Sequence, residues 1–325
     1  MTARGGDAAV ERTAPGKLLL AGEYAVLHGA EAVVVAMDRR ARAHWPRAPQ
    51  APRPASPFLD AVAAQLEARL GPDHASARAA RALAVDTSAF TSGGQKLGLG
   101  SSAAATVAAT ATALAVGEVR ASVQEIFELA AAAHGDAQGR RGTRGSGADI
   151  AASCYGGALR FRLQGGRAEI SPLRISAAVT WLPFFTGQSA DTVSMVAQVE
   201  RCGAAARPAL RAIAEAAAAL ADALTRDDGP AILAAVAAGG QAIAALGLAA
   251  GHDLETGAVR AARAAVSHLG VQVKTTGAGG GDLAVAAVPA EASRNEVAAA
   301  LIQAGCHVLP LSIDPRGVDL GLPPV

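Results

Sequence analysis

The sequence predicts an α+β protein in which antiparallel sheets are covered by Ala-rich helices. Apolar strands occur in neighbouring pairs near both ends of the chain, and long Ala-rich segments separate them. The last part follows the order strand, glycine turn, strand, helix, strand. With 325 residues, the chain is long enough for two domains. It is 51% hydrophobic but only 3% aromatic, so the core is expected to consist of Ala, Val and Leu.

The first half is expected to contain two antiparallel strand pairs, one further short strand and four helices, of which the last is a helix of small residues that begins at Ser146-Gly147-Ala148-Asp149. Ser56 and Pro57 form a favourable start for the first helix, because serine caps and proline suits the first helical position. The Pro-rich stretch Trp45–Pro57 before it has no periodicity and predicts a surface loop. The expected strands are Lys17–Ala21, Ala32–Met37 continuing to Ala43, Ala82–Val85, Gly157–Arg162 and Ala168–Ser171, and the expected helices are Pro57–Leu70, Ser102–Val116 and Ser122–Gly135.

A second domain is expected to begin with the strand Ala177–Gly187, which places the boundary between residues 176 and 177. Its strand and helix order predicts an antiparallel sheet that is covered on one face by helices. The expected helices are Ser189–Arg201, Pro208–Leu224, Pro230–Leu246, Leu254–Leu269 and Ala290–Ala304, and the further strands are Val271–Thr275, Leu283–Val288 and His307–Ile313. Pro208–Leu224 and Pro230–Leu246 are expected to form an antiparallel pair.

Charge and composition exclude several classes of protein. A net charge of +1 argues against bulk nucleic-acid binding and against an electrostatic membrane surface. Cys154, Cys202 and Cys306 are far apart and odd in number, which indicates reduced, buried thiols. The first residues lack an apolar signal core, and no uncharged apolar run is expected to be long enough to span a bilayer. We therefore expect a soluble cytoplasmic protein, either a monomer or a homodimer.

The stretch KLGLGSSAAA, Lys96–Ala105, is the strongest candidate for a ligand site. Glycines directly before a helix expose unpaired N–H groups at the positive end of the helix dipole, which suits phosphate. The stretch is not a Walker A loop, because no Gly-Lys-Ser/Thr closes it. The stretch also fits a loose dinucleotide-binding pattern, in which Glu118 follows at about the sequence separation expected for an acidic residue that contacts the ribose. A Rossmann loop should follow a buried hydrophobic strand, however, and the residues before this stretch are polar.

Two further glycine-rich segments carry charged residues. Arg140, Arg141 and Arg144 precede Ser146-Gly147-Ala148-Asp149, which favours an anionic substrate beside one carboxylate, although a solvated arginine face and a helix-capping Asp149 remain alternatives. The segment Thr276–Asp282 has more glycine than a hairpin needs, which predicts close approach of its backbone to another group. Among 29 Lys and Arg residues only three are lysine, and all of these lie in or beside glycine-rich segments: Lys17, Lys96 and Lys274.

Three segments in this order resemble the motifs of the GHMP kinases: PGKLLLAGEYAVLHG from Pro15, GLGSSAAA from Gly98, and KTTGAGGGD from Lys274. The resemblance covers the chain from end to end. It implies an N-terminal domain like ribosomal protein S5 domain 2, with a left-handed βαβ crossover, and a ferredoxin-like C-terminal domain. It also implies phosphoryl transfer from MgATP to a small molecule at a site between the two domains.

Several details are similar to the phosphomevalonate kinase branch of this family, including Gly22-Glu23-Tyr24 and Gly279-Gly280-Gly281-Asp282. Mevalonate kinases usually have Glu-His in the first motif and a glutamate where this chain has Gln138, whereas His28-Gly29 is mevalonate-kinase-like. The implied acceptor is phosphomevalonate. A mevalonate kinase, another GHMP small-molecule kinase, a related decarboxylase and a non-catalytic sensor remain alternatives.

The resemblance also implies roles for individual residues. Lys17 steadies the transferring group, Asp149 orients Lys17 or the acceptor, and the two are expected to form an ion pair. Ser102 is expected to contact Mg²⁺ and Lys96 to contact phosphate. The remaining implied ATP-binding residues are Gly98, Leu99, Gly100, Ser101 and Ala103. The remaining implied substrate-binding residues are Tyr24, Arg140, Arg141, Arg144, Ser146, Gly147, Lys274, Gly279, Gly280 and Asp282.

Overall fold

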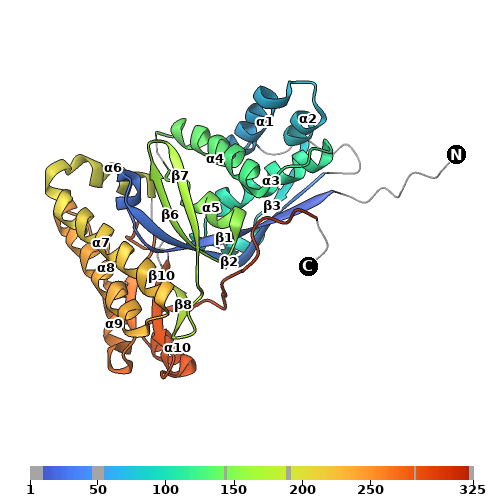
Figure 1. Ribbon diagram of the computed structural model, residues 1–325. Coiled ribbons are helices and arrows are strands. Elements are labelled where there is room, and N and C mark those ends of the chain that lie inside the picture. The colour runs from blue at the N-terminus through green and yellow to red at the C-terminus, as the bar shows by residue number, and fades with distance from the viewer. Residues whose placement is uncertain (1–9, 46–54, 143–144, 188–191, 282, 322–325) are drawn as a thin grey trace.

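The computed structural model describes residues 10–45, 55–142, 145–187, 192–281 and 283–321. Two antiparallel sheets and their helices form the molecule (Figure 1). The strands of the larger sheets are β1 Glu11–Ala21, β2 Glu31–His44, β3 Ala84–Asp86, β6 Ala158–Gln164, β7 Arg167–Leu173, β8 Val179–Phe185, β9 Gln272–Thr275, β10 Leu283–Pro289 and β11 His307–Val308. A small hairpin consists of β4 Thr91–Ser92 and β5 Gln95–Lys96.

Several helices begin where the sequence supplies a capping residue. Ser56 accepts a hydrogen bond from the amide of Leu59, and Ser122 forms a reciprocal capping box with Glu125. The helices are α1 Pro57–Leu70, α2 Ala75–Ala82, α3 Ser101–Val116, α4 Val123–Gly139, α5 Ala148–Tyr155, α6 Thr192–Arg201, α7 Arg207–Arg226, α8 Gly229–Ala250, α9 Gly257–Val266 and α10 Arg294–Gln303. The expected helices are thus present, and α2 is an element that the sequence interpretation missed.

The first sheet has the order β1-β2-β6-β7, with β3 paired to β2, and every pair is antiparallel. Helices α3 and α5 pack on β1 and β2, and α1 and α4 lie outside them (Figure 1). The α+β class is therefore confirmed. The handedness of the crossover stays a prediction.

The second sheet has the order β11-β8-β10-β9. The expectation that helices cover only one face of it is wrong, because all seven residues of β10 are buried. Leu182 and Ala284 pack with α9 and α10 on one face, whereas Phe185 and Val285 belong to the core that includes α7 and α8. The unbroken apolar run of β10 was the sequence signal for a strand buried on both faces.

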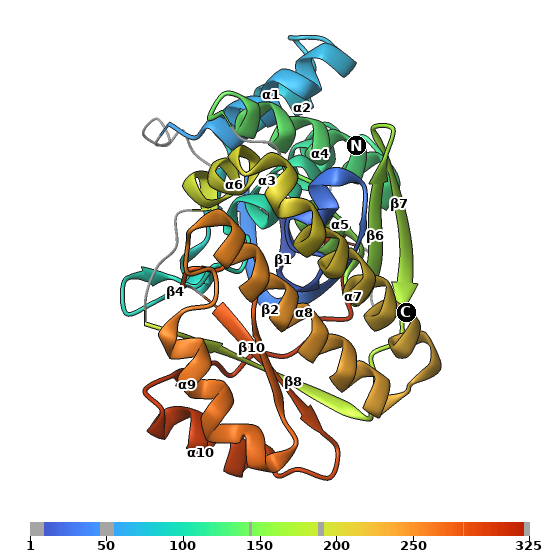
Figure 2. The ribbon, with the colours of Figure 1, turned by 90° about the vertical axis from the view of Figure 1, so that its left-hand side faces the viewer.

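Helices α7 and α8 lie between the two sheets (Figure 2). Helix α7 packs on β2, and α8 packs on β9. Helix α8 has 22 residues without a charge, so the expectation that no uncharged apolar run is long enough to cross a bilayer is wrong. Half of its most apolar window is buried inside the protein, where Ala and Gly allow the close packing against α7.

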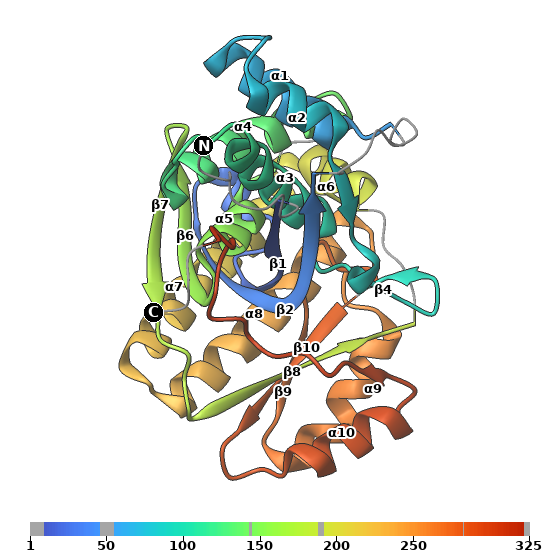
Figure 3. The same ribbon diagram turned by 90° about the vertical axis from the view of Figure 1, so that its right-hand side faces the viewer.

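The chain beyond the second sheet returns to the first (Figure 3). The expected strand His307–Ile313 is divided, because β11 pairs with β8 whereas Ile313 forms a bridge with Met37 of β2. The Asp314 amide then donates to the Ala36 carbonyl at 3.0 Å, and Arg40 forms an ion pair with Asp314 at 2.5 Å. The boundary between residues 176 and 177 stays a prediction, and the C-terminal segment fastens the two sheets together.

Candidate active site

The segment around Lys17 on β1 is in direct contact with the Gly98–Gly100 turn. The Lys17 amide donates to the Leu99 carbonyl at 2.8 Å. A Cβ on Gly16 would lie 2.7 Å from the same carbonyl oxygen and 2.6 Å from the Phe90 ring. Glycine is therefore required at position 16, because any side chain would separate the strand from the turn. This contact places Lys17 beside the turn that opens α3.

The turn before α3 leaves the start of that helix open to an anion. Gly98 and Gly100 have φ angles of 68° and 74°, and Gly100 is the N-cap without a side-chain hydrogen bond. The first amides of a helix lack partners within the helix, so these groups and the helix dipole favour a bound phosphate. The Lys17 ammonium lies 3.5 Å from the Gly98 carbonyl oxygen. A cation thus stands next to the expected anion position.

The other expected ATP-binding residues differ in whether their side chains are accessible to a ligand. Ser101 and Ser102 are partly exposed in the first turn of α3, whereas Ala103 and the Leu99 side chain are buried. Leu99 and Ala103 are therefore limited to backbone contacts. Lys96 is exposed on the β4–β5 hairpin.

A histidine that the sequence interpretation missed contacts this helix start. The Ser102 hydroxyl lies 3.2 Å from Nε2 of His134, which is 2% exposed on α4. The imidazole stacks on the Phe58 ring with 4.8 Å between ring centroids and 24° between planes. A histidine within an apolar helix was too weak a signal, since such residues are often only packed in the core.

The second segment, before α5, forms a similar helix start. Gly147 is its N-cap with a φ of 86°, and the Ser146 hydroxyl accepts from the Ala148 amide at 3.2 Å. The Asp149 carboxylate accepts from the Ile150 amide at 3.0 Å. The expected ion pair between Asp149 and Lys17 stays a prediction. In this structure the carboxylate is held at the N-terminus of α5, where the helix dipole favours it.

The arginines of the same segment lie at the end of α4. Arg140 is the C-cap of that helix, and it and Arg141 are exposed to solvent. Arg144 lies outside the described residues. The two described arginines are therefore free to move toward an anion that enters from solvent.

The third motif holds its lysine in the interior, and the expectation that Lys274 contacts substrate stays a prediction. Its ammonium forms an ion pair with the Glu23 carboxylate, and both side chains are 1% exposed. The ammonium also donates to the Thr275 carbonyl at 2.8 Å. The Tyr24 hydroxyl, expected to touch substrate, donates to the Ala278 carbonyl, and burial raises the pKa of this phenol.

The glycine-rich loop after Lys274 packs against the protein itself. The Gly280 amide donates to the Leu254 carbonyl at 2.8 Å, and a Cβ on Gly279 would lie 2.5 Å from that oxygen. The close approach that the sequence predicts is therefore to Leu254. Asp282 lies outside the described residues.

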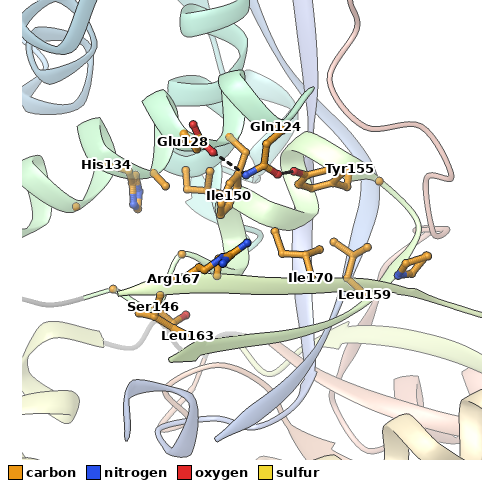
Figure 4. A pocket seen from close by; sticks show the side chains of 18 of the residues that line it. Gln124, Glu128, His134, Ser146, Ile150, Tyr155, Leu159, Leu163, Arg167 and Ile170 are labelled. Carbon is orange, nitrogen blue, oxygen red and sulfur yellow. Dashed lines mark hydrogen bonds between the residues drawn. The ribbon is translucent and has the colours of Figure 1, made fainter. Parts of the chain in front are cut away.

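A cavity of about 1240 Å³ adjoins the segment before α5. It lies between α4, α5 and the β6–β7 hairpin, and its walls are largely apolar (Figure 4). His134 and Ser146 reach it from the side of the glycine turns, and Arg167 crosses it from β7.

The dinucleotide alternative is not supported. The strand directly before the Gly98–Gly100 turn is β5, a two-residue exposed strand of a hairpin rather than a buried parallel strand. Among the described residues, no group of three or more His, Cys, Asp or Glu side chains is arranged to hold a metal ion.

Comparisons with known proteins agree with these motifs. Residues 62–157 match the family described as the GHMP kinases N terminal domain. A relative from Streptomyces sp. strain CL190, named phosphomevalonate kinase, is 27% identical over 95% of this chain and 98% of its own length.

The structural comparisons show the same fold. The Streptococcus pneumoniae phosphomevalonate kinase in complex with phosphomevalonate and AMPPNP has a TM-score of 0.78 at 21% identity, over 94% of this chain and all of the other. The Methanococcus jannaschii mevalonate kinase has a TM-score of 0.71 at 16% identity, over 96% and 99% of the two chains.

Proposed function

From a chain with a GHMP kinase N-terminal domain and the GHMP kinase fold, we propose an enzyme that transfers the γ-phosphoryl group of ATP to phosphomevalonate. The product is diphosphomevalonate. The observation that carries this proposal is the contact between Lys17 and the uncapped start of α3 at the Gly98–Gly100 turn. The relative and the solved complex support the choice of acceptor.

The start of α3 binds the phosphates of ATP in this proposal. The amides of Ser101 and Ser102 face an anion without first having to release a side-chain cap. Lys17 neutralises charge on the transferring group as it moves between donor and acceptor. Such fixed charges and dipoles stabilise the transition state without rearranging, which is how phosphoryl transfer is mainly catalysed.

The acceptor chemistry explains why cations are needed. An oxygen of the acceptor phosphate forms a bond to Pγ as the bond from Pγ to the bridging oxygen breaks, and ADP leaves with that electron pair. The acceptor phosphate is largely ionised near pH 7, so little deprotonation is required. Two unit charges 4 Å apart repel by about 4 kcal/mol at an effective dielectric of 20. Arg140, Arg141 and Arg144 are proposed to offset this repulsion.

Asp149 has a positioning role in this proposal. Its carboxylate is anchored to the Ile150 amide, so it is fixed at the start of α5. An ionised acceptor does not need a general base, whereas an alcohol acceptor would. Ser146 and Gly147 line the same turn and are proposed to contact the acceptor.

Magnesium fits the site as an ion that ATP carries. Mg²⁺ is commonly bound through substrate phosphates and retains several waters, and Ser102 offers one hydroxyl at the start of α3. When bound, the ion would neutralise charge on the phosphate chain.

An ADP-release assay with MgATP tests the proposal, with mevalonate and phosphomevalonate as parallel acceptors and ³¹P NMR of the product. We expect a new diphosphate signal with phosphomevalonate only. A monophosphate ester formed from mevalonate would overturn the acceptor and give Asp149 the role of a base. No turnover with either acceptor would overturn the proposed reaction.

The Lys17→Met variant tests the role of the lysine. We expect turnover to fall by at least about 10³-fold, which corresponds to roughly 4 kcal/mol, while ATP still binds. Lys96→Met is the contrasting variant, because Lys96 is exposed on a hairpin and should affect mainly the KM for ATP. Loss of ATP binding in Lys17→Met would show that the lysine only binds the nucleotide.

A further inference from the structure

After β11 the chain leaves the second sheet and crosses the first as a C-terminal strap, residues 312–319 (Figure 3). One end of the strap lies on β2, where the Asp38 amide donates to the Ser312 carbonyl at 3.0 Å. The other end lies on β1, where the Asp319 amide donates to the Thr13 carbonyl at 2.8 Å. The strap therefore contacts both strands of the β1–β2 pair.

Three backbone hydrogen bonds form a closed ring at the middle of the strap. The Ala36 amide donates to the Gly157 carbonyl at 2.8 Å, and the Gly157 amide donates to the Asp314 carbonyl at 2.8 Å. The Asp314 amide completes the ring by donating to the Ala36 carbonyl at 3.0 Å. Ala36 is the β2 residue that is paired with Lys17, and Gly157 lies just beyond the end of α5. The ring thus joins the strand position opposite Lys17 to the strap and to the end of α5.

A β-bulge in the β1–β2 pair lies beside this ring. Pro15 is paired with Arg40 but Gly16 with Met37, so the two residues between Met37 and Arg40 are inserted into β2. Bulges bend a strand and re-aim its side chains, and they are frequent next to active sites. The hydrogen bonds from the strap to β2 fall at this bulge. Because Lys17 follows Gly16 directly, the direction of its side chain depends on how the bulge is held.

The strap also fits closely against the end of α5. A Cβ on Gly156 would lie 2.4 Å from the Gly317 nitrogen, and a Cβ on Gly317 would lie 2.0 Å from the Cys154 carbonyl oxygen. The Val318 amide donates to the same carbonyl at 3.0 Å. Backbone meets backbone here, so a shift of the strap would shift the end of α5. That helix has eight residues, and Asp149 is anchored at its other end.

Arg40 clamps the strap to the two strands. Its five N–H groups donate to five acceptors, which are the Thr13 hydroxyl and carbonyl, the Asp314 carboxylate, and the carbonyls of Arg316 and Gly317. The Asp314 side chain is 6% exposed and also accepts from the Arg316 amide at 3.0 Å. A guanidinium presents its donors in a rigid, planar arrangement, so these bonds define one geometry. The Arg40–Asp314 pair is therefore suited to fix a position.

We propose that Arg40 and Asp314 are positioning residues that, through the C-terminal strap, set the place of Lys17 relative to the start of α5. They act without touching ATP or the acceptor. The consequence for turnover rests on the proposed function, whereas the placement of Lys17 does not. A displacement of about 1 Å at a reacting group can cost about 10²-fold in rate, so fixing the lysine matters for phosphoryl transfer.

Carbon NMR of the lysine side chains tests this placement in the ligand-free protein. The chain has only three lysines, so labelling with [ε-¹³C]lysine gives three side-chain signals, which Lys17→Met and Lys96→Met assign. We expect Arg40→Gln to shift the Lys17 signal and to leave the Lys96 signal in place. Arg42→Gln is the matched control and should shift neither, because Arg42 joins β2 to β1 through its ion pair with Glu11 at 2.9 Å and not through the strap.

Two results of this NMR experiment would overturn the proposal, whether or not the protein proves to be a kinase. One is a Lys17 signal that stays in place in folded Arg40→Gln, which would mean that the clamp only adds stability. The other is an equal shift in Arg42→Gln, which would mean that any loss of charge on β2 moves the signal. If Arg40→Gln does not fold, Asp314→Asn keeps the shape of its side chain and is measured with the same outcomes.

Kinetics shows whether Arg40 acts on turnover through Lys17. Arg40→Gln should lower kcat about 10- to 100-fold while the KM for ATP stays within about 2-fold, because a group is misplaced and none that binds is lost. In the Lys17→Met background the same substitution should change the residual turnover less than about 2-fold, since no ammonium is left to misplace. An equal fall in both backgrounds would overturn an action through Lys17.

Discussion

The Ser102 hydroxyl at the start of α3 lies 3.2 Å from Nε2 of His134 on α4. A hydroxyl has one proton and two lone pairs, so the partner of that proton decides what the oxygen offers to a ligand. If Nε2 accepts the proton, both lone pairs of Ser102 remain available to a metal ion or a donor. The Phe58 ring holds the imidazole in place by stacking.

His134→Phe should weaken binding of MgATP while preserving the packing on Phe58. We expect the KM for MgATP to rise about 10-fold, equivalent to about 1.4 kcal/mol, with the acceptor KM unchanged, because Ser102 loses its orienting partner. Initial rates at varied Mg²⁺ and ATP measure this. His307→Phe is the control, since His307 is exposed on β11. An equal rise in the acceptor KM would contradict the assignment.

Replacing Arg140, Arg141 and Arg144 by Gln should raise the acceptor KM by roughly 10- to 100-fold, equivalent to about 1.4–2.7 kcal/mol. The KM for ATP should change little, because these side chains are proposed to offset the charge of the acceptor phosphate. Steady-state kinetics with each substrate varied in turn provides the measurement. Arg211→Gln is the control, because Arg211 is exposed on α7. Equal effects on the two KM values would mean that the acceptor lies elsewhere.

Gly279→Ala and Gly277→Ala form a matched pair of substitutions. Both glycines have positive φ angles, 75° and 69°. A Cβ on Gly279 would lie 2.5 Å from the Leu254 carbonyl oxygen, whereas nothing lies within 4 Å of one on Gly277. We therefore expect Gly279→Ala to lower the melting temperature distinctly more than Gly277→Ala. Similar melting curves for the two variants would show that the approach to Leu254 is unimportant.

The thiols should differ in their reactivity in the native protein. Cys154 and Cys306 are buried, and burial raises the pKa of both thiols, so little thiolate is present near pH 7. Cys202 is only partly buried. Mass spectrometry after brief alkylation should find Cys202 modified first, with the other two reacting only on unfolding. Rapid labelling of Cys154 in folded protein would contradict this prediction.

Local sequence signals predicted most of the elements. The Ser56-Pro57 pair and the Ala-rich composition predicted the bounds of α1 and the existence of α3, α7 and α8, because capping and helix propensity act within a few residues. The short helix α2 was not predicted from the sequence, because its eight residues carry little periodic signal. The burial of β10 on both faces was also missed, although its unbroken apolar run indicated it.

For the candidate site, the sequence by itself determined the motifs and the class of ligand. Glycine turns before helices predict anion binding because the backbone chemistry of a helix start is local. Only the tertiary structure decided that Lys274 pairs with Glu23 and that His134 contacts Ser102. A charged side chain takes the partner that folding brings within about 4 Å, and that partner is set by packing between distant segments, which residue spacing does not record.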